Sequence, residues 1–161
     1  MNKLKLSGAC IAALATVAAF PAHAMPDRAF VMDAMKGDNS EIALGRMAMQ
    51  RSASPAVKGY GQMLAEDHSA HRMKLVALGR MMQVPPTMAL AADGIMAKRM
   101  MMRLHGQAFD AAFKHHMVAD HEQDIDKYNH EVQTARSPQL RQLAHDTLPT
   151  LRKHLDGAEA L

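Results

Sequence analysis

The stretch PAVKGYGQMLAEDHSAHRMKLVALGRMM, residues 55–82, decides the fold. Its inward-facing positions recur at alternating spacings of four and three residues, at Val57, Gly61, Leu64, His68, His71, Leu75, Leu78 and Met82. This spacing keeps side chains on one face of an α-helix and is typical of a helix in a bundle. Ser54 and Pro55 form a typical helix start. The stretch therefore predicts one helix of about 40 Å, at a rise of 1.5 Å per residue.

Upstream of this helix, the pattern predicts two helical pieces separated by a break. A short leading helix covers residues 28–35, and Glu41, Leu44 and Ala48 share one face of a second helix that ends near residue 52. The residues Gly37-Asp38-Asn39-Ser40 lie between the two pieces. Because Asp, Asn and Ser are typical N-cap residues, they predict an interruption and a new helix start at this point.

Downstream, a Met-rich segment over 88–105 and a further segment to about residue 131 are predicted to be helical, with Gly106 kinking or dividing them. Ser137-Pro138 repeats the helix-start signal and begins a last helix that contains Pro149. Leu140, Ala144, Leu148, Leu151, Leu155 and Ala158 form its apolar stripe, and His154 lies beside that stripe. Four main helices with short connections predict an antiparallel four-helix bundle with a short extra N-terminal helix.

Composition supports this all-α prediction for the whole chain of 161 residues. Aromatic residues make up 4% of it and Trp is absent, which is too little to fill a typical β-sandwich core, whereas Ala, Leu and Met favour helices. A formal net charge of +3 is too small to predict binding to nucleic acid. The 16 Met and 10 His are unusual for this length.

The N-terminus has the pattern of a secretory signal peptide. Lys3 and Lys5 precede an apolar run over 11–20, and Ala22-His23-Ala24 follows the small-x-small cleavage rule. The alternative is an uncleaved anchor helix, but a membrane span takes about 20 apolar residues and this run is shorter. We therefore predict a signal peptide over 1–24 and a bundle domain over 25–161, periplasmic and without a membrane span. Cys10 would be lost, so the mature chain would contain no cysteine.

No sequence motif of a known enzyme class is present. The chain has no Gly-rich phosphate loop, no G-x-S-x-G and no H-E-x-x-H, so an enzyme is the less favoured class and no organic cofactor is expected. It also lacks the two Glu-x-x-His pairs of di-iron bundle proteins.

The candidate for chemistry is a polar cluster inside the predicted bundle. Glu41, His68, His121 and His154 lie on or near the inward stripes of four helices, and His71 is a possible extra ligand. One ligand from each helix can converge on one metal ion, and imidazole with carboxylate suits Zn, Cu, Fe or Ni. The competing interpretation is that each histidine is a core residue satisfied by a hydrogen bond. Asp67 and Asp120 each precede one of these histidines and are candidate partners for them on neighbouring helices.

The methionines form a secondary candidate for metal binding. Met96, Met100, Met101 and His105 lie close in sequence, and thioethers are soft ligands that suit Cu(I). The favoured alternative is that Met fills a core poor in aromatic residues. Three adjacent helical residues cannot all face inward, so at least one of Met100 to Met102 is expected to be exposed or to face a partner.

Several segments in order resemble an exported bacterial family catalogued as domain of unknown function 4142. The segments are Phe30-Val31, Ser40 to Gly45, Val57 to Tyr60 leading to Asp67-His68, Gly106 to Asp110, Met117 to His121, and Leu148-Pro149 with His154-Leu155. The resemblance covers about residues 28 to 160 and implies export and a ferritin-like bundle, with no established reaction. Glu41, His68, His121 and His154 fall at recurrent polar positions of the family pattern, whereas His71 and the dense Met content depart from it.

Together these observations favour a periplasmic bundle that binds a transition metal and acts in metal buffering or envelope stress. The alternative is a non-enzymatic envelope structural or interaction protein, whose exposed methionines would contact a partner protein. A third and weaker hypothesis is a redox enzyme with a variant metal centre. The sequence does not determine the oligomeric state.

Overall fold

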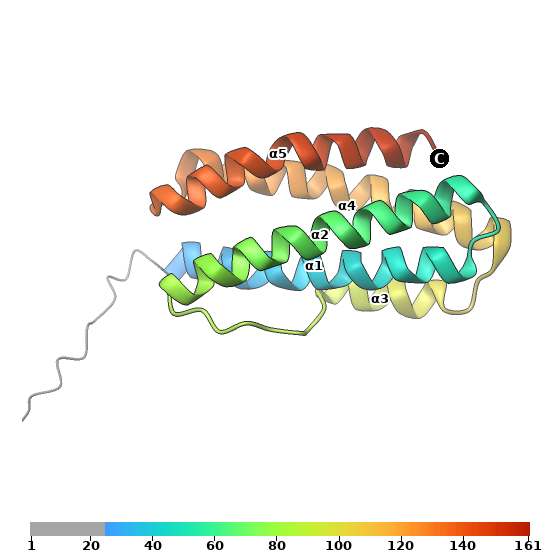
Figure 1. Cartoon of the computed structure of the whole chain (residues 1–161), viewed down its shortest axis with the longest axis horizontal. Helices are drawn as coiled ribbons and strands as arrows, with labels where there is room; N and C mark the ends of the chain where they lie inside the picture. The colour runs from blue at the N-terminus through green and yellow to red at the C-terminus, as the bar shows by residue number, and fades with distance from the viewer. Residues whose placement is uncertain (1–24) are drawn as a thin grey trace, which may run out of the picture.

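A computed structural model describes residues 25–161, which form five α-helices and no strand (Figure 1). The helices are α1 (Met25–Arg51), α2 (Pro55–Met81), α3 (Ala92–Met101), α4 (Gly106–Thr134) and α5 (Pro138–Glu159). The predicted all-α class is therefore confirmed. The predicted signal peptide, residues 1–24, lies outside the described part of the chain.

The four long helices form two pairs of neighbours. Helix α1 packs mainly against α2 and helix α4 mainly against α5, while contacts between the two pairs are sparser. Within each pair the helices run in opposite directions, and α2 and α4 run the same way (Figure 1). A long connection after α2 leads to the short helix α3, which lies beside α1.

The predicted break over Gly37–Ser40 is wrong, because α1 is one continuous helix from Met25 to Arg51. The cap-type side chains of this segment bind other parts of the chain. Asn39 Nδ2 donates to the carbonyl oxygens of Thr87 and Ala89 at 3.0 and 2.9 Å. Such tertiary hydrogen bonds remove the competition between these side chains and the helix backbone. The extra short helix of the fold is therefore α3, and the predicted leading helix is the first part of α1.

Gly106 divides the Met-rich segment from the helix that follows, as one of the two sequence alternatives predicted. Its φ of +55° lies in the left-handed region, which glycine enters without a steric penalty. Helix α3 ends at Met101, and α4 begins at Gly106. The remaining predicted helix starts are confirmed: Ser54 Oγ accepts from Val57 N, and Ser137 Oγ accepts from Leu140 N at 3.2 Å.

Two glycines set the spacing between α1 and α2. A Cβ atom on Gly45 would lie 2.4 Å from the carbonyl oxygen of Gly61, and one on Gly61 would lie 2.6 Å from that of Gly45. Such distances are shorter than any real Cβ contact. The two backbones can therefore pack this closely only where neither residue carries a side chain. Among residues 25–161, none of the helices is long and apolar enough to cross a membrane.

Candidate metal centre

Each of the four long helices places one buried polar residue at the same level of the interior. These are Glu41 on α1, His68 on α2, His121 on α4 and His154 on α5. Their exposed fractions are 1%, 5%, 1% and 1%. The sequence predicted all four as ligands, and the structure brings them together.

The three imidazole rings form a compact triangle. Their centroids are separated by 5.9 Å for His68 and His121, and by 5.3 Å for each of these rings and His154. One ligand atom from each ring lies within 4.8 Å of the other two. Glu41, Asp120 and His121 form a second group by the same criterion. Because His121 belongs to both groups, the five side chains surround one region of the interior.

Each imidazole is held by its outer nitrogen. His68 Nδ1 donates to Asp38 at 2.9 Å, and His154 Nε2 donates to Asp67 at 2.9 Å. His121 Nδ1 donates to the carbonyl oxygen of Met117 at 2.8 Å. These bonds fix the tautomer and orientation of each ring, as the outer partners of metal-binding histidines do.

The remaining ring nitrogens have no hydrogen-bond partner within residues 25–161. They are His68 Nε2, His121 Nε2 and His154 Nδ1, and all three are buried. With the outer nitrogens protonated, each of these atoms carries a lone pair. Three buried lone pairs close together are unfavourable without a shared cation or proton, since each unsatisfied group costs about 1–3 kcal/mol.

The carboxyl group of Glu41 is also without a donor. Neither of its oxygens has a hydrogen-bond partner among the described residues. Burial raises the pKa of Glu41 well above its usual value, and the neighbouring Asp120 raises it further. Burial also acts to raise the pKa of Asp120, but the interaction with Glu41 and the nearby His116, His121 and Lys127 together outweigh burial and lower this pKa. The raised pKa of Glu41 favours its protonated form, and a metal cation is the natural replacement for that proton.

Burial favours the neutral form of two of the three histidines, His121 and His154. Burial lowers the pKa of His121 from 6.5 to about 4, with the nearby His68 contributing. Burial likewise lowers the pKa of His154 to about 4, although Asp67 acts in the opposite direction. Protons therefore compete little with a metal ion for these two rings.

His71, the possible extra ligand, is not part of this group. Its Nδ1 donates to Asp38 Oδ2 at 2.9 Å, and its Nε2 lies 3.4 Å from the hydroxyl of Tyr128. Both of its ring nitrogens are therefore engaged. His71 instead shares with His68 the carboxylate of Asp38, whose pKa is lowered because these two contacts outweigh burial.

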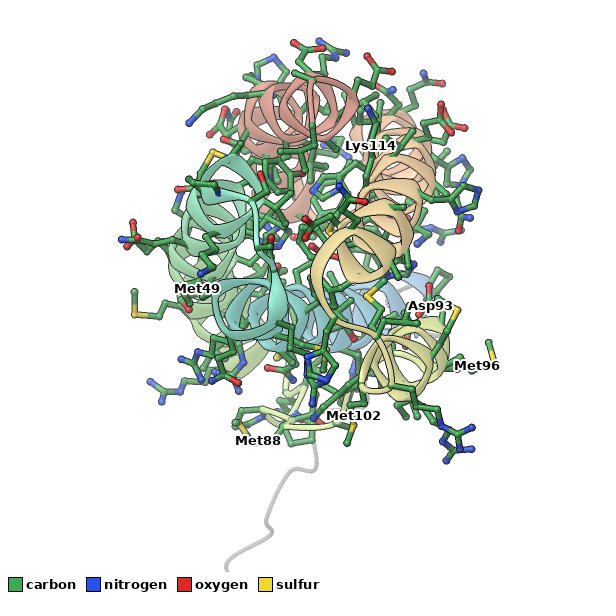
Figure 2. All side chains as sticks on the ribbon, turned by 90° about the vertical axis from the view of Figure 1, so that its right-hand side faces the viewer. Met49, Met88, Asp93, Met96, Met102 and Lys114 are labelled. Atoms are coloured by element: carbon green, nitrogen blue, oxygen red, sulfur yellow. The ribbon has the colours of Figure 1, made fainter. Side chains whose placement is uncertain are left out.

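The Met-rich candidate is divided between the core and the surface. Met101 is fully buried in the apolar core, whereas Met96 and Met100 are 67% and 52% exposed. His105 is exposed, and its Nε2 lies 3.1 Å from Arg51 Nη1. Figure 2 shows Met96 and Met102 on the outer surface around α3. Met101 thus points away from its predicted co-ligands, and the expected exposure of at least one of Met100 to Met102 is confirmed.

Two features of this region differ from the sequence prediction. His154 lies on the buried face of α5, while Leu155, predicted for that face, is only partly buried. Asp38 was one of three candidate helix caps in the sequence, yet it is 3% exposed and binds two histidines. Its position three residues before Glu41 places both side chains on one face of a continuous helix. The pairing of Asp67 with a histidine of a neighbouring helix is confirmed.

The fold and these side chains define an all-α protein with buried imidazole and carboxyl groups that could hold a cation. The chain belongs to the family described as "Domain of unknown function (DUF4142)", which matches residues 12–161. This confirms the resemblance inferred from the sequence segments. No curated protein and no solved structure matches the chain.

Proposed function

We propose that this protein binds one transition-metal ion through His68, His121 and His154, with Glu41 as a carboxylate ligand. The observation that carries the proposal is the set of three buried, unpartnered ring nitrogens, contributed by residues with ligand atoms within 4.8 Å of one another. A histidine with a purely structural role would be expected to have its hydrogen-bonding capacity satisfied. Here the outer nitrogens are satisfied and the inner ones are not.

The ligand set favours Zn(II), Cu(II), Fe or Ni(II), which imidazole and carboxylate bind well. A single ion is favoured over a pair. Each of the three histidines offers only one unpartnered nitrogen, and His121 is shared by the two groups of candidate ligands. The chain also lacks the Glu-x-x-His pairs with which bundle proteins hold two irons.

We place the site in a ferritin-like four-helix bundle. The support is the order of helix directions, with α2 and α4 running the same way after one long connection (Figure 1). One long crossover connection is typical of ferritin-like folds. The signal-peptide pattern over residues 1–24 favours a periplasmic location. Metal buffering or a role in envelope stress suits a metal site in a protein whose sequence carries no enzyme motif.

The test is elemental analysis of the untagged mature chain, residues 25–161, isolated from the periplasm. The same protein is then incubated with Cu, Zn, Fe or Ni and desalted. Near-stoichiometric retention of one element is expected. If no metal is retained under any loading, the proposal is wrong, and an envelope interaction protein becomes the better hypothesis.

The double variant His68→Ala/His121→Ala is expected to lose the bound metal while keeping its helical circular dichroism. A matched control is His115→Ala/His130→Ala, which removes two exposed histidines of α4 outside the group. The control is expected to retain the metal. Equal stoichiometry in both variants would show that binding occurs elsewhere.

A further inference from the structure

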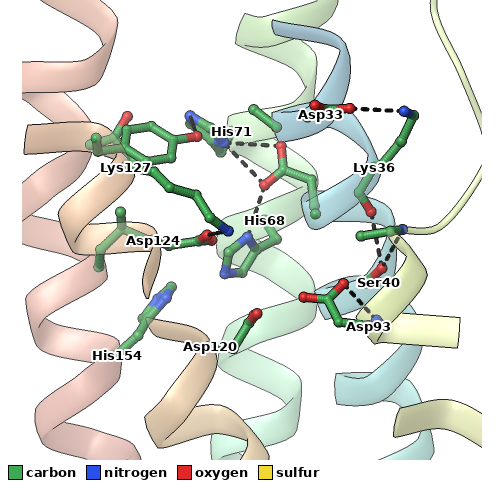
Figure 3. A pocket seen from close by; sticks show the side chains of 18 of the residues that line it. Asp33, Lys36, Ser40, His68, His71, Asp93, Asp120, Asp124, Lys127 and His154 are labelled. Carbon is green, nitrogen blue, oxygen red and sulfur yellow. Dashed lines mark hydrogen bonds and ion pairs between the residues drawn. The ribbon is translucent and has the colours of Figure 1, made fainter. Parts of the chain in front are cut away.

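A cavity of about 430 Å³ lies beside the histidine triangle and is lined by residues of all five helices (Figure 3). His68 and His154 line it, and these are two of the residues with an unpartnered ring nitrogen. Asp33, which is 73% exposed at its side chain, also lines it. The cavity therefore connects the outer surface with the proposed ligands.

The lining of this cavity is strongly acidic. Six aspartates contribute to it: Asp33, Asp38, Asp67, Asp93, Asp120 and Asp124. The lysines in the lining are Lys36 and Lys127. A concave surface lined mainly by one sign of charge concentrates ions of the opposite sign. The cavity is therefore suited to cations.

One cation of the chain itself already lies among these acids. Lys127 Nζ contacts Asp124 Oδ1 at 2.8 Å, and Figure 3 shows this contact close to His68. Burial alone would lower the pKa of Lys127, but Asp124, Asp120 and Asp93 raise it. The side chain of Lys127 is 53% exposed, against 19% for Asp124. The ammonium group can therefore move into solvent while the carboxylate stays in the cavity.

We propose that the acid-lined cavity is the path by which the metal ion reaches the histidines, and that Lys127 is a tethered counter-cation displaced from Asp124 by the incoming ion. This inference rests on the proposed function. A divalent ion interacts with the aspartates about twice as strongly as an ammonium group at the same distance. It can therefore replace Lys127 where a monovalent ion does not.

The test is the rate of metal loading, measured by stopped-flow absorbance with cobalt(II) chloride at low ionic strength. Cobalt(II) changes its visible absorption when imidazole replaces water as a ligand. Asp124→Asn is expected to slow loading about fivefold, and Lys127→Met is expected to speed it about fivefold, from the effect of one charge on a divalent ion. Both differences should shrink at high salt. The final absorption change should be the same in all variants.

Matched controls come from the same helix. Asp126→Asn removes an exposed aspartate of α4 that does not line the cavity, and it is expected to load at the wild-type rate. The double variant Asp124→Asn/Lys127→Met removes both charges together and should return the rate close to that of the wild type. Circular dichroism checks that each variant is folded.

The outcomes separate this inference from the proposed function. Equal final absorption with equal rates in wild type, Asp124→Asn and Lys127→Met would overturn the path while leaving the metal centre intact. A slower rate in Lys127→Met would also overturn the counter-cation role. If the wild type shows no absorption change at any cobalt(II) concentration, the proposed function fails, and the path fails with it.

Discussion

Two neighbouring layers of the interior are buried alike but differ in chemistry. One consists of the polar residues Glu41, His68, His121 and His154, and the other of the apolar residues Leu44, Leu64, Met117 and Ala158. On every long helix the two members are three or four residues apart, so the layers are separated by about one helical turn. All eight side chains are at most 5% exposed.

The difference shows that burial alone does not tell what a layer contributes. The apolar layer contains no group that needs a hydrogen bond, and it belongs to a core cluster that includes Phe109 and Phe113. Among the residues that the structure describes, the polar layer contains five buried atoms without a hydrogen-bond partner, two on Glu41 and one on each histidine. We infer that the apolar layer stabilises the fold and that the polar layer lowers its stability until a cation binds.

The largest expected effect comes from breaking the apolar side of this comparison. Phe113 is fully buried, stacks on Phe109 at 5.7 Å and meets Tyr60 edge-on at 6.1 Å. Phe113→Ala should lower the free energy of unfolding by about 3–5 kcal/mol in urea denaturation, because it leaves a cavity. Met102→Ala, at a 52% exposed side chain, is the control and should change it by less than about 0.5 kcal/mol.

The metal stoichiometry of folded Phe113→Ala should equal that of the wild type, because none of the proposed ligands is changed. A loss of stability below about 1 kcal/mol would contradict the stabilising role of the core cluster that contains both Phe113 and the apolar layer, since truncation of a fully buried Phe usually costs far more.

A smaller effect per residue is expected when the pH of the metal-free protein is lowered, because the buried histidines then reduce the free energy of unfolding. The pKa of both His121 and His154 is lowered from 6.5 to about 4 in the folded state, chiefly by burial. The unfolded chain therefore binds more protons between pH 6.5 and 4, so stability is lost as pH falls through this window. From pH 7 to pH 5 each of these two histidines should lower the free energy of unfolding by about 2 kcal/mol.

Urea denaturation at the two pH values measures this loss. The variant His145→Ala, which removes an exposed histidine of α5, should show the same pH dependence as the wild type. Replacing His121 and His154 by Asn should flatten the dependence of the free energy of unfolding on pH. If stability falls just as much between pH 7 and pH 5 in that variant, other ionisable groups cause the loss of stability in acid.

The smallest expected effect on stability comes from Glu41, the carboxyl group of the polar layer. Burial and the neighbouring Asp120 raise the pKa of Glu41 above 4.5, so the folded protein keeps a proton that the unfolded chain releases. This group therefore destabilises the metal-free protein as pH rises above 4.5. Glu41→Gln removes the ionisable group, and its amide can donate to Asp120. It should raise stability at pH 7.5 by about 1 kcal/mol, and by less at pH 4.

The same substitution should weaken metal binding, because an amide is a poorer ligand than a carboxylate. Thermal melting with and without metal measures both effects. Glu66→Gln, at an exposed position of α2, is the control and should alter neither quantity. A lower melting temperature of metal-free Glu41→Gln at pH 7.5 would contradict the proposed strain in the polar layer.

Much of the fold was predictable because helix periodicity is local. The stripe of residues 55–82 and the Ser-Pro helix starts predict α2 and the beginning of α5 correctly. The continuity of α1 was not predictable, because Asn39 is kept out of a capping role by carbonyl oxygens from residues 87 and 89. Those contacts depend on where the loop after α2 lies, which no local pattern shows.

The residues of the candidate site were predicted from the sequence, but most of the side chains that hold them by hydrogen bonds were not. Glu41, His68 and His121 follow from their stripes, whereas His154 needed the exact phase of a helix that contains Pro149. The role of Asp38 depends on the relative shift of α1 and α2 along their axes. The separation of Met96 from Met101 likewise follows from the short length and packing of α3.

The pairing of α1 with α2 and of α4 with α5 also has a consequence for how the chain folds. Each pair joins helices that are adjacent in sequence, so each can form early through local contacts. The four proposed ligands come from four different helices, two from each pair. Neither pair alone can therefore assemble the site. Metal could therefore bind only after the two pairs have packed against each other. A bound ion should then slow unfolding, because it stabilises the packed state.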